Sequence, residues 1–577
     1  MPNPYKKTNQ VDPNILKIVE NYEKSKESLT KIFREIQSEL GVLETKTIED
    51  VANAINLPAH HAYGIASFYS MFSLDPREEN ILRICDGPAC WLKGSTAILK
   101  NALEVYKHEP GWVVERSSCL GLCDRAPAGL VNDVQVGPIA KDILSDRERM
   151  LTIKGFDYSK PRPGEVRVMM ADAGEINPDS IESALKHGSY QGLKKSLELS
   201  PDDIIQEIEV SGLTGRGGAG FPVGRKWRFV HGETNKPKYI ICNADESEPL
   251  HFKDRVLIDS NPHQVLEGMA LAGFATDASE GIIYIRGEYE QQANLLELAV
   301  QEAISQRLLG ENILDTDFTF HIHIHRGAGA YICGEETALI ESLEGNRGEP
   351  RLRPPYPPQF GFRGYPTLVN NVESFAAIPA IITNGAGWYN SLSTYSTPGT
   401  KLYTVMGFIN KPGLFEAPFG LTLRQIIDQF SGGMRPGSEF YFALAGGAAG
   451  TIVPTSHLDI PIDYMSISQG VSLGAGGFLI CDKSISPVDV LKEILFFFNV
   501  ESCGKCTPCR VGTKRSFDIL DRMASGNGEN GDIEELISLA DLMQDSSFCG
   551  LGQSAAIPLK SAISHFGSEF LSTITSI

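Results

Sequence analysis

The sequence predicts an α/β multidomain protein, and three observations support this prediction. Its 577 residues are enough for several domains, each with its own core. Apolar residues make up 42 % and charged residues 21 %, the proportions of an ordinary globular chain. Short β-branched runs alternate with stretches of helical periodicity in two separate regions, and both ends of the chain have a mainly helical pattern.

Composition shifts along the chain predict its domains. We expect a helical N-terminal segment over 1–78, a small α/β domain over 79–155, a linker over 156–194, a larger α/β domain over 195–395, a β-containing module over 396–484 and a helical region over 485–577. Helical periodicity in the first segment ends at Gly41, a residue type typical of helix C-termini. Pro, Gly and charged residues in "GFDYSKPRPGEV" favour the linker, and the apolar runs "KYIICNA", "GIIYIRG" and "TFHIHIH" predict strands of the larger domain.

Charge and cysteine content exclude several classes of protein. The chain has 52 basic against 72 acidic residues and a net charge of −20, which disfavours sequence-independent nucleic-acid binding. The first residues lack the apolar core of a secretory signal, and no run of about 18 apolar residues predicts a membrane span. Eleven cysteines in such a chain favour reduced thiols and metal ligands over disulfides. We therefore expect a cytoplasmic protein.

Three closely spaced cysteines predict an iron–sulfur site near the C-terminus. Cys503, Cys506 and Cys509 follow the spacing C-x2-C-x2-C in "SCGKCTPCR", and Cys549 lies in a second Gly-containing loop. Thiolates at this spacing can each bind a different iron of a 4Fe–4S cluster, with a fourth ligand from elsewhere in the fold. A zinc site, which prefers paired CxxC motifs, and unliganded core cysteines are the alternatives.

A second cysteine set lies in the small α/β domain. Cys85 and Cys90 are spaced C-x4-C, and Cys119 and Cys123 are spaced C-x3-C. Two loops that each supply two thiolates suit a 2Fe–2S cluster, with zinc as the alternative. The remaining cysteines stand singly in apolar or Gly-rich segments, which favours core packing: Cys242, Cys333 and Cys481.

A glycine-rich loop predicts an anion site. Gly215, Gly217 and Gly220 match G-x-G-x-x-G, but the preceding segment has a helical pattern with Ser200 as its N-cap, so a standard Rossmann fold is not expected. Glycines let backbone N–H groups approach a phosphate. Four cations without an intervening acid point to the same ligand class: Arg216, Arg225, Lys226 and Arg228. The alternative is a Gly-rich turn with a solvated basic face.

Acidic and amide side chains in three further motifs could complete a nucleotide pocket. They are Asp245, Glu246 and Glu248 in "CNADESEP", Glu335 and Glu336 in "GEET", and Asn370 and Asn371 in "NNVES". Such groups accept hydrogen bonds from sugar hydroxyls and from a carboxamide. Each acidic pair, taken singly, is also typical of the first turn of a helix.

In this order, the motifs "GRGGAGFPVGRKW", "CNADESEP", "YICGEETALIESLEG", "NNVES" and "SCGKCTPCR" resemble the NADH-binding flavoprotein (51-kDa-type) family of respiratory complex I. The N-terminal part, with "HAYGIASFYSMF" and the two cysteine pairs, resembles the 24-kDa-type thioredoxin-like module. The resemblance implies a thioredoxin-like 2Fe–2S domain, an FMN-binding α/β domain, a ubiquitin-like module and a C-terminal helical bundle with a 4Fe–4S cluster. It also implies that NAD(H) reduces FMN, that FMN passes electrons singly to the 4Fe–4S cluster, and that the 2Fe–2S cluster is a side acceptor.

The resemblance also implies roles for individual residues. FMN contacts would fall on Gly215, Arg216, Gly217, Lys226, Asn243, Asp245, Glu335, Asn370 and Asn371, and NAD(H) contacts on Phe221, Lys226, Phe229, Glu248 and Glu336. Gly218, Gly220, Glu246 and Gly334 complete the cofactor-binding set. Glu336 is the catalytic candidate, and Tyr356 stands where the family suggests a stacking phenylalanine.

Fusion of both modules in one chain is unlike complex I, where they are separate subunits. The absence of a CxxCxxCxxxCP tail before Ile577 disfavours the NADP-reducing iron-only hydrogenase type. We therefore expect the diaphorase subunit of a soluble NAD-reducing nickel–iron hydrogenase, in a hetero-oligomer with an iron–sulfur electron-transfer subunit and hydrogenase subunits. The alternatives are the flavin subunit of an NAD-dependent formate dehydrogenase, the complex I subunit, and a non-catalytic electron-transfer scaffold with a decayed nucleotide pocket.

Overall fold

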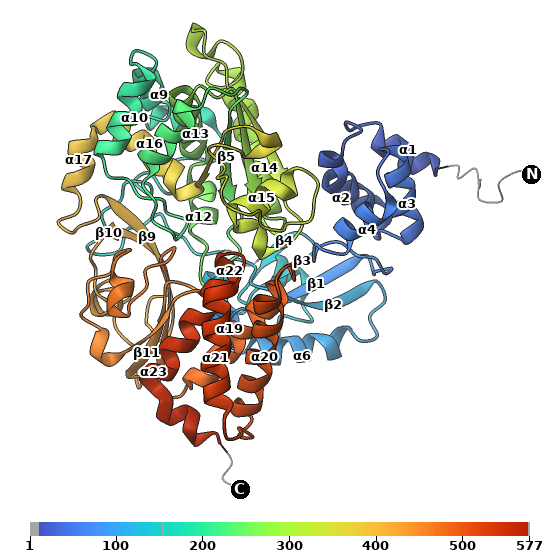
Figure 1. Cartoon of the computed structure of the whole chain (residues 1–577), viewed down its shortest axis with the longest axis vertical. Coiled ribbons are helices and arrows are strands. Elements are labelled where there is room, and N and C mark those ends of the chain that lie inside the picture. Colours follow the sequence, from blue (N-terminus) through green and yellow to red (C-terminus); the bar gives the residue numbers. More distant parts are fainter. Residues whose placement is uncertain (1–10, 153–154, 575–577) are drawn as a thin grey trace, which may run out of the picture.

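The computed structural model describes residues 11–152 and 155–574. These residues form three β-sheets of four, five and four strands, with helices packed around them. In Figure 1 a group of N-terminal helices stands to one side, the largest α/β domain lies at the top, and the C-terminal helices form a bundle at the bottom. The predicted α/β multidomain architecture is confirmed.

The described part of the N-terminal segment, from residue 11 onward, consists of several separate helices, and residues 1–10 of the predicted segment lie outside the described residues. Its helices are α1 (Pro13–Val19), α2 (Leu29–Leu40), α3 (Thr45–Ala54) and α4 (Ala59–Ala66). The periodic stretch before Gly41 is split by a loop between α1 and α2, and Gly41 ends α2 with a φ of +77°. The segment then docks on the large domain, where the N–H groups of Ser70 and Met71 donate to Gly329 O and Ala328 O, both at 3.0 Å.

The first sheet belongs to the small α/β domain. Its strands are β1 (Asn80–Cys85), β2 (Trp112–Ser117), β3 (Gly129–Val131) and β4 (Val134–Val136), in the order β2-β1-β3-β4, and its helices are α5 (Pro88–Leu92), α6 (Ser95–Tyr106) and α7 (Arg147–Leu151). Strands β1 and β2 are parallel because α6 carries the chain back between them.

The segment predicted as a linker is packed against the protein. It contains α8 (Ile181–Lys186), and α9 (Gln191–Ser196) crosses its predicted end at residue 194. Arg162 donates to Lys411 O at 2.8 Å, and the buried Glu416 carboxylate accepts the N–H groups of Met169 and Met170 at 3.1 and 3.0 Å. The segment rich in Pro, Gly and charged residues is therefore an irregular connection between domains that is fixed to the protein by hydrogen bonds.

The large domain holds a parallel sheet in the order β7-β6-β5-β8. Its strands are β5 (Tyr239–Ala244), β6 (Glu280–Ile285), β7 (His321–Arg326) and β8 (Thr367–Asn371). Its helices are α10 (Pro201–Val210), α11 (Val223–Gly232), α12 (Lys253–Ser260), α13 (Pro262–Thr276), α14 (Glu290–Ser305), α15 (Glu336–Leu343), α16 (Val372–Asn384) and α17 (Ala386–Ser391). Strand β5 is an almost continuous buried apolar run, as expected for a parallel strand covered on both faces.

The glycine loop follows a helix, as the sequence predicts. Ser200 caps α10 through a reciprocal capping box with Asp203, and Pro201 is the first helical residue. The loop between α10 and α11 therefore differs from the strand-to-helix loop of a Rossmann fold.

The β-containing module is a mixed five-stranded sheet. Its strands are β9 (Thr400–Gly407), β10 (Gly413–Pro418), β11 (Phe440–Ala445), β12 (Thr451–Pro454) and β13 (Gly477–Asp482), in the order β10-β9-β13-β11-β12, with the short helix α18 (Leu423–Gln425) beside it. Only the central pair, β9 and β13, is parallel among the described strands of this sheet.

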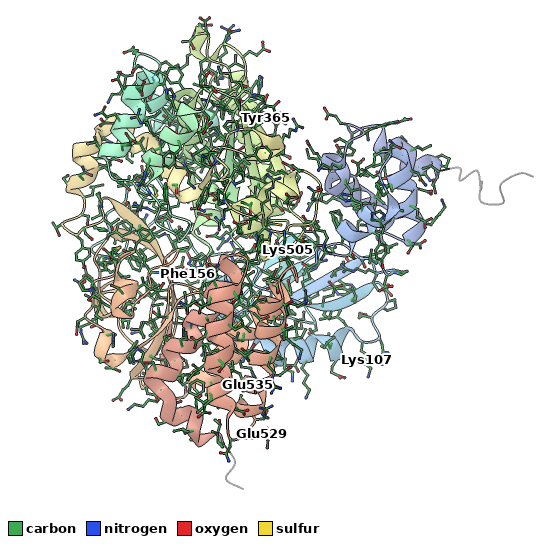
Figure 2. All side chains as sticks on the ribbon, in the orientation of Figure 1. Lys107, Phe156, Tyr365, Lys505, Glu529 and Glu535 are labelled. Carbon is green, nitrogen blue, oxygen red and sulfur yellow. The ribbon has the colours of Figure 1, made fainter. Side chains whose placement is uncertain are left out.

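The C-terminal region is a helical bundle. Its helices are α19 (Pro487–Glu501), α20 (Thr507–Ala524), α21 (Asp532–Ser546), α22 (Gly550–Ser554) and α23 (Ala556–Ser572). Figure 2 labels Lys505 at the end of this bundle that faces the large domain, and Glu529 and Glu535 toward its opposite end. No helix in the described part of the chain is long and apolar enough to cross a membrane.

Candidate functional site

The predicted nucleotide residues gather at the carboxyl edge of the parallel sheet. The chain builds β5, β6 and β7 outward in one direction and then places β8 on the other side of β5, so its direction reverses between β5 and β8. Ligands of open parallel sheets bind at such a reversal. Asn243 in β5 and Asn371 at the end of β8 are register partners there.

The glycine loop lies across the end of β8. The N–H of Gly215 donates to Phe221 O at 2.8 Å and closes the loop. A Cβ on Gly217 would lie 3.4 Å from the Cβ of Asn371. At Gly220, where φ is +67°, a Cβ would lie 2.6 Å from the ring of Tyr464. Gly220 is thus needed for its backbone conformation and its close approach to the β-containing module, whereas Gly217 only lies within contact distance of β8.

The expected cluster of four cations around this loop is not what the structure shows. The Arg216 side chain is fully buried, and it donates to Tyr389 Oη at 2.8 Å and to Thr400 O at 3.1 Å. Arg228 pairs with Asp202 and with Glu209. Both side chains are therefore bonded to other residues of the protein. A run of basic residues in the sequence does not reveal such partners.

The other two cations remain beside the loop. Lys226 Nζ donates to Val369 O at 2.9 Å and lies 3.6 Å from Glu336 Oε2. The Arg225 guanidinium lies 5.5 Å from the ring centre of Phe229. Lys226 therefore connects the loop, β8 and the "GEET" motif.

Asp245 has a buried acceptor that lacks a partner. Its Oδ1 accepts from Ser247 Oγ at 2.9 Å, while its Oδ2 is buried without a hydrogen-bond partner. Burial is the main reason that the pKa of this carboxyl rises to about 8. Buried polar atoms in proteins are normally paired, so Oδ2 fits a donor from a bound ligand, such as a sugar hydroxyl.

This burial makes a pH-dependent prediction for the ligand-free protein. Because the folded pKa lies above that of an ordinary aspartate, folding takes up a proton, and this residue's contribution to stability falls as pH rises from about 4 to 8. Asp245→Asn should therefore gain thermal stability relative to the parent protein as pH is raised from about 5 to 8. Calorimetry at both pH values measures this gain, with the exposed Asp545→Asn as control. An equal difference at both pH values would contradict the assignment.

The acids of "CNADESEP" have separate roles. Glu246 Oε2 accepts the N–H groups of Asp254 and Arg255, both at 3.1 Å, and so caps α12. Glu248 Oε1 accepts from Ala449 N at 3.1 Å, and burial raises its pKa to about 7. Of the two, Glu246 is directed into the fold, and Glu248 joins the loop to the β-containing module.

The two acids of "GEET" also differ. Glu335 is the N-cap of α15, and its Oε2 accepts from Thr337 N at 3.0 Å and Ala338 N at 2.9 Å. Glu336 begins the helix, and its carboxylate lies 3.5 Å from Arg353 Nη1 as well as beside Lys226. The capping alternative thus applies to Glu335, whereas Glu336 is part of a partly exposed cluster of charges.

Of the other predicted residues, Asn243 and Asn370 lie near the carboxyl ends of β5 and β8. Asn243 Nδ2 donates to Gly334 O at 2.8 Å, and Gly218 has a φ of +117°. Asn370 accepts from Trp227 Nε1 at 3.1 Å in the amide orientation that satisfies both of its ends. Three aromatic side chains are exposed and available for stacking: Phe221, Phe229 and Tyr356.

A buried charge network beneath the site was not predicted. Lys253 Nζ donates to Asn371 Oδ1 at 3.0 Å and lies 3.2 Å from Glu373 Oε2, which also pairs with Lys401 at 2.5 Å. Lys253 also pairs with Asp254, whose carboxylate accepts from Asn371 Nδ2 at 2.7 Å. Only an unusual density of charge in apolar surroundings, such as "HFKDRVLI", hints at such a network in the sequence.

The four C-terminal cysteines, Cys503, Cys506, Cys509 and Cys549, line one small pocket. Cys506 is the N-cap of α20, Cys509 lies in its first turn, and Cys549 is the N-cap of α22. Helices α20 and α21 fill the long gap between the third and fourth cysteines and bring both loops to the same end of the bundle. Ile332 also lines the cavity, only two residues before Gly334 of the nucleotide site.

The four N-terminal cysteines are buried together at the end of β1. Cys119 Sγ and Cys123 Sγ are 3.7 Å apart, and the thiol of Cys85 contacts those of Cys90 and Cys119. No three His, Cys, Asp or Glu side chains in the described residues have the spacing of a single-ion metal site. The structure thus gathers both predicted cysteine sets, each in a separate module.

Comparisons with known protein families identify the cofactor-binding regions. A Nuo51 FMN-binding domain matches residues 208–380, an NADH-ubiquinone oxidoreductase-F iron–sulfur binding region matches 489–573, and a thioredoxin-like [2Fe–2S] ferredoxin matches 15–146. These matches confirm FMN, a 4Fe–4S cluster and a 2Fe–2S cluster as the cofactors. The glycine cradle, the unpaired Asp245 Oδ2 and the two cysteine sets fit these groups.

Relatives match most of the chain. The F 2 subunit of the NADH-quinone oxidoreductase of Rhizobium meliloti is 44 % identical over 67 % of this chain and 92 % of its own length. The HndC subunit of the NADP-reducing hydrogenase of Solidesulfovibrio fructosivorans is 43 % identical over 70 % of this chain and 83 % of its own. A chain in the crystal structure of an H2-reduced NAD+-reducing [NiFe]-hydrogenase superposes with a TM-score of 0.82 and 31 % identity, covering 96 % of this chain and 94 % of that one.

Proposed function

We propose that this chain, which belongs to the family of the NADH-quinone oxidoreductase F subunits, is the diaphorase subunit of an NAD-reducing hydrogenase. It is an oxidoreductase that moves electrons between NAD(H), FMN and iron–sulfur clusters. Its relatives are subunits of larger assemblies, so the chain works in a hetero-oligomer. We place it in the cytoplasm, with an iron–sulfur electron-transfer subunit and hydrogenase subunits as partners.

Whole-chain coverage supports the hydrogenase assignment over complex I. The NADH-quinone oxidoreductase relatives align with about two thirds of this chain, for example 67 % for the Rhizobium meliloti protein. The hydrogenase chain spans 96 % of it, including the N-terminal module. The fused architecture is therefore shared with that hydrogenase chain. Sequence identity favours the complex I subunit instead, because it is 44 % with the Rhizobium meliloti subunit and 31 % with the hydrogenase chain. The experiment below distinguishes these two candidates.

The residues of the site divide the work. FMN, when bound, accepts a hydride's two electrons from the nicotinamide and passes them on singly. The glycine loop would hold its phosphate, with Asn371, whose amide bonds Lys253 and Asp254, supporting the loop, and Asp245 Oδ2 would accept a hydrogen bond from a ribityl hydroxyl. Lys226 and Glu336, 3.6 Å apart, would orient the nicotinamide nucleotide, with an exposed aromatic ring such as Phe229 stacking on it. The paired Lys226 and Glu336 and the unpaired Asp245 oxygen argue against a decayed scaffold.

The test purifies the chain with its bound partners. We expect NADH-driven reduction of an acceptor dye whose potential lies well above that of NADH by the chain alone, and hydrogen-dependent reduction of NAD+ by the assembly. Dye reduction without hydrogen-dependent activity would favour the formate dehydrogenase or the complex I alternative. Adding formate or quinone to the assembly then distinguishes these two, because only one of them should react in each case. No NADH-driven reduction in an FMN-replete chain would support the scaffold.

The 2Fe–2S module should be dispensable for dye reduction. Cys85 lies in β1 of the small domain, whereas the nucleotide site and the C-terminal cysteines lie in other modules. Cys85→Ala is expected to abolish a 2Fe–2S signal in electron paramagnetic resonance while NADH-to-dye turnover stays within about twofold of wild type. Cys481→Ala, in β13, serves as the buried-cysteine control. Loss of turnover in a folded, FMN-replete Cys85→Ala protein would place this cluster on the main path.

A further inference from the structure

A buried arginine joins the N-terminal cysteine loop to the nucleotide site. Arg286 follows β6, and its side chain is only 2 % exposed. Its Nη2 donates to Cys119 O at 2.7 Å, and its Nη1 donates to Glu246 O at 2.6 Å. Its Nε donates to Glu288 Oε2 at 3.0 Å. One guanidinium therefore contacts the backbone of a predicted cluster ligand and the backbone of the "CNADESEP" loop.

A second arginine holds the same cysteine loop. Arg255 in α12 donates through Nε to Gly121 O at 3.2 Å. Its Nη2 donates to both carboxylate oxygens of Asp124, at 2.8 and 2.9 Å. The loop is also fitted to the large domain sterically, because a Cβ on Gly121, whose φ is +67°, would lie 2.0 Å from Tyr289 Oη. We call Arg255 and Arg286 the arginine clamp.

The clamp acts on only one of the two cysteine pairs. Cys119 and Cys123 lie in the clamped loop, whereas Cys85 and Cys90 lie in β1 and α5 of the small domain. Half of the ligand set is therefore positioned by residues of the large domain. The relative placement of the two loops, and with it the geometry of a shared cluster, depends on the interface between the domains.

The two arginines differ in charge balance. Arg255 is balanced by two carboxylates: its Nη2 donates to both oxygens of the buried Asp124 of the clamped loop, and its Nη1 lies 3.4 Å from Asp259 Oδ2. Arg286 pairs with Glu288 of its own domain and directs an N–H to the carbonyl of Cys119. A hydrogen-bond donor and a buried cation beside a cluster ligand stabilise the reduced, more negative cluster. Arg286 is thus the member of the clamp suited to affect redox chemistry.

We propose that Arg286 is a positioning residue that raises the reduction potential of the 2Fe–2S cluster held by Cys85, Cys90, Cys119 and Cys123. Arg255 anchors the same loop so that this contact is maintained. The inference rests on the proposed function, since it takes the cluster from it. The contrasting possibility is that Arg286 only joins two domains, in which case its loss changes stability but leaves the potential unaltered.

Redox titration of the whole chain, followed by electron paramagnetic resonance of the reduced 2Fe–2S cluster, tests this. Arg286→Gln removes the charge and keeps one amide donor. We expect the ratio of reduced to oxidised cluster at a fixed ambient potential to fall at least about tenfold, a shift of about 59 mV for one electron. Arg286→Lys keeps the charge and should shift this ratio less than Arg286→Gln. FMN content should stay at the wild-type level in both.

Arg326→Gln is the matched control. Arg326 ends β7, the strand beside β6, and pairs with Glu290 without contacting the cysteine loop. A wild-type potential in Arg286→Gln, or an equal shift in Arg326→Gln, would overturn the inference. If Arg286→Gln assembles no cluster, Arg286→Lys decides: a cluster with a near wild-type potential supports the proposal, and a large shift or no cluster overturns it. Absence of a 2Fe–2S signal in the wild-type chain would instead overturn the cluster assignment itself.

Discussion

Cys506→Ser is expected to leave FMN bound but to stop electrons from leaving it. Cys506 occupies the N-cap position of α20 and lines the same pocket as Cys503, Cys509 and Cys549. A serine hydroxyl is a harder and poorer ligand for iron–sulfur clusters than a thiolate, so one corner of the 4Fe–4S cluster should open. The reduced variant should lack the 4Fe–4S signal, and NADH-driven electron transfer to the partner subunits should fall to background.

Thr507→Ala is the matched control for this experiment. Thr507 is the first residue of α20, beside Cys506, and it brings no metal ligand. It should keep both the 4Fe–4S signal and the electron transfer to partners. An unchanged signal and rate in Cys506→Ser would refute the ligand assignment. Loss of FMN in that variant would show that the two sites are structurally coupled, contrary to the modular account.

Glu336→Gln should weaken the reaction with NADH by about ten- to a hundredfold in kcat/KM, with FMN content near full. If the Glu336 carboxylate accepts the N–H of the nicotinamide carboxamide, that charge-assisted hydrogen bond is worth roughly 1.5–3 kcal/mol. Glutamine keeps the shape but leaves one acceptor oxygen. It also removes the negative partner of Lys226 Nζ, 3.6 Å away. Titration of NADH against the FMN-replete variant, with steady-state kinetics, measures the effect.

Glu341→Gln on the same helix controls for loss of a carboxylate. Glu341 pairs with Arg351 at 2.6 Å, outside the predicted nucleotide contacts. Its replacement should change stability by about 1 kcal/mol or less and leave NADH affinity unaltered. Wild-type affinity and turnover in Glu336→Gln would contradict the assigned role. The structure already separates this residue from helix capping, because Glu335 is the N-cap of α15.

Much of the fold could be predicted because its signals are local. Strands β5 and β6 are mainly apolar runs, β7 alternates histidine with isoleucine, and the Ser200–Pro201 start of α10 is a capping signature. Helix α13 (Pro262–Thr276) was not predicted, because it is buried on nearly all sides and its sequence lacks an amphipathic period. The break between α1 and α2 was not predicted either, because the periodic pattern of apolar residues continues across it.

The candidate site was predictable in its location but less so in the role of each side chain. Motifs place Asn243, Asp245 and Asn371 at the sheet edge, and the structure brings them together. Whether an acidic residue caps a helix or faces a ligand depends on the direction of its side chain. The adjacent residues Glu335 and Glu336 differ in this respect, since Glu335 caps α15 and Glu336 lies beside Lys226. Long-range partners such as Arg286 leave no local signal, because their contacts join segments more than 100 residues apart: Arg286 reaches Cys119 across 167 positions.

The central claim is that electrons from NADH enter through FMN and reach the 4Fe–4S cluster of the same chain. Anaerobic titration of the purified whole chain with NADH, followed by flavin absorbance and electron paramagnetic resonance, tests it most directly. The account predicts that flavin absorbance bleaches and that the 4Fe–4S signal of the reduced cluster grows in the same titration. A chain with full FMN and intact clusters, whose flavin and 4Fe–4S cluster are reduced by dithionite but not by NADH, would contradict it.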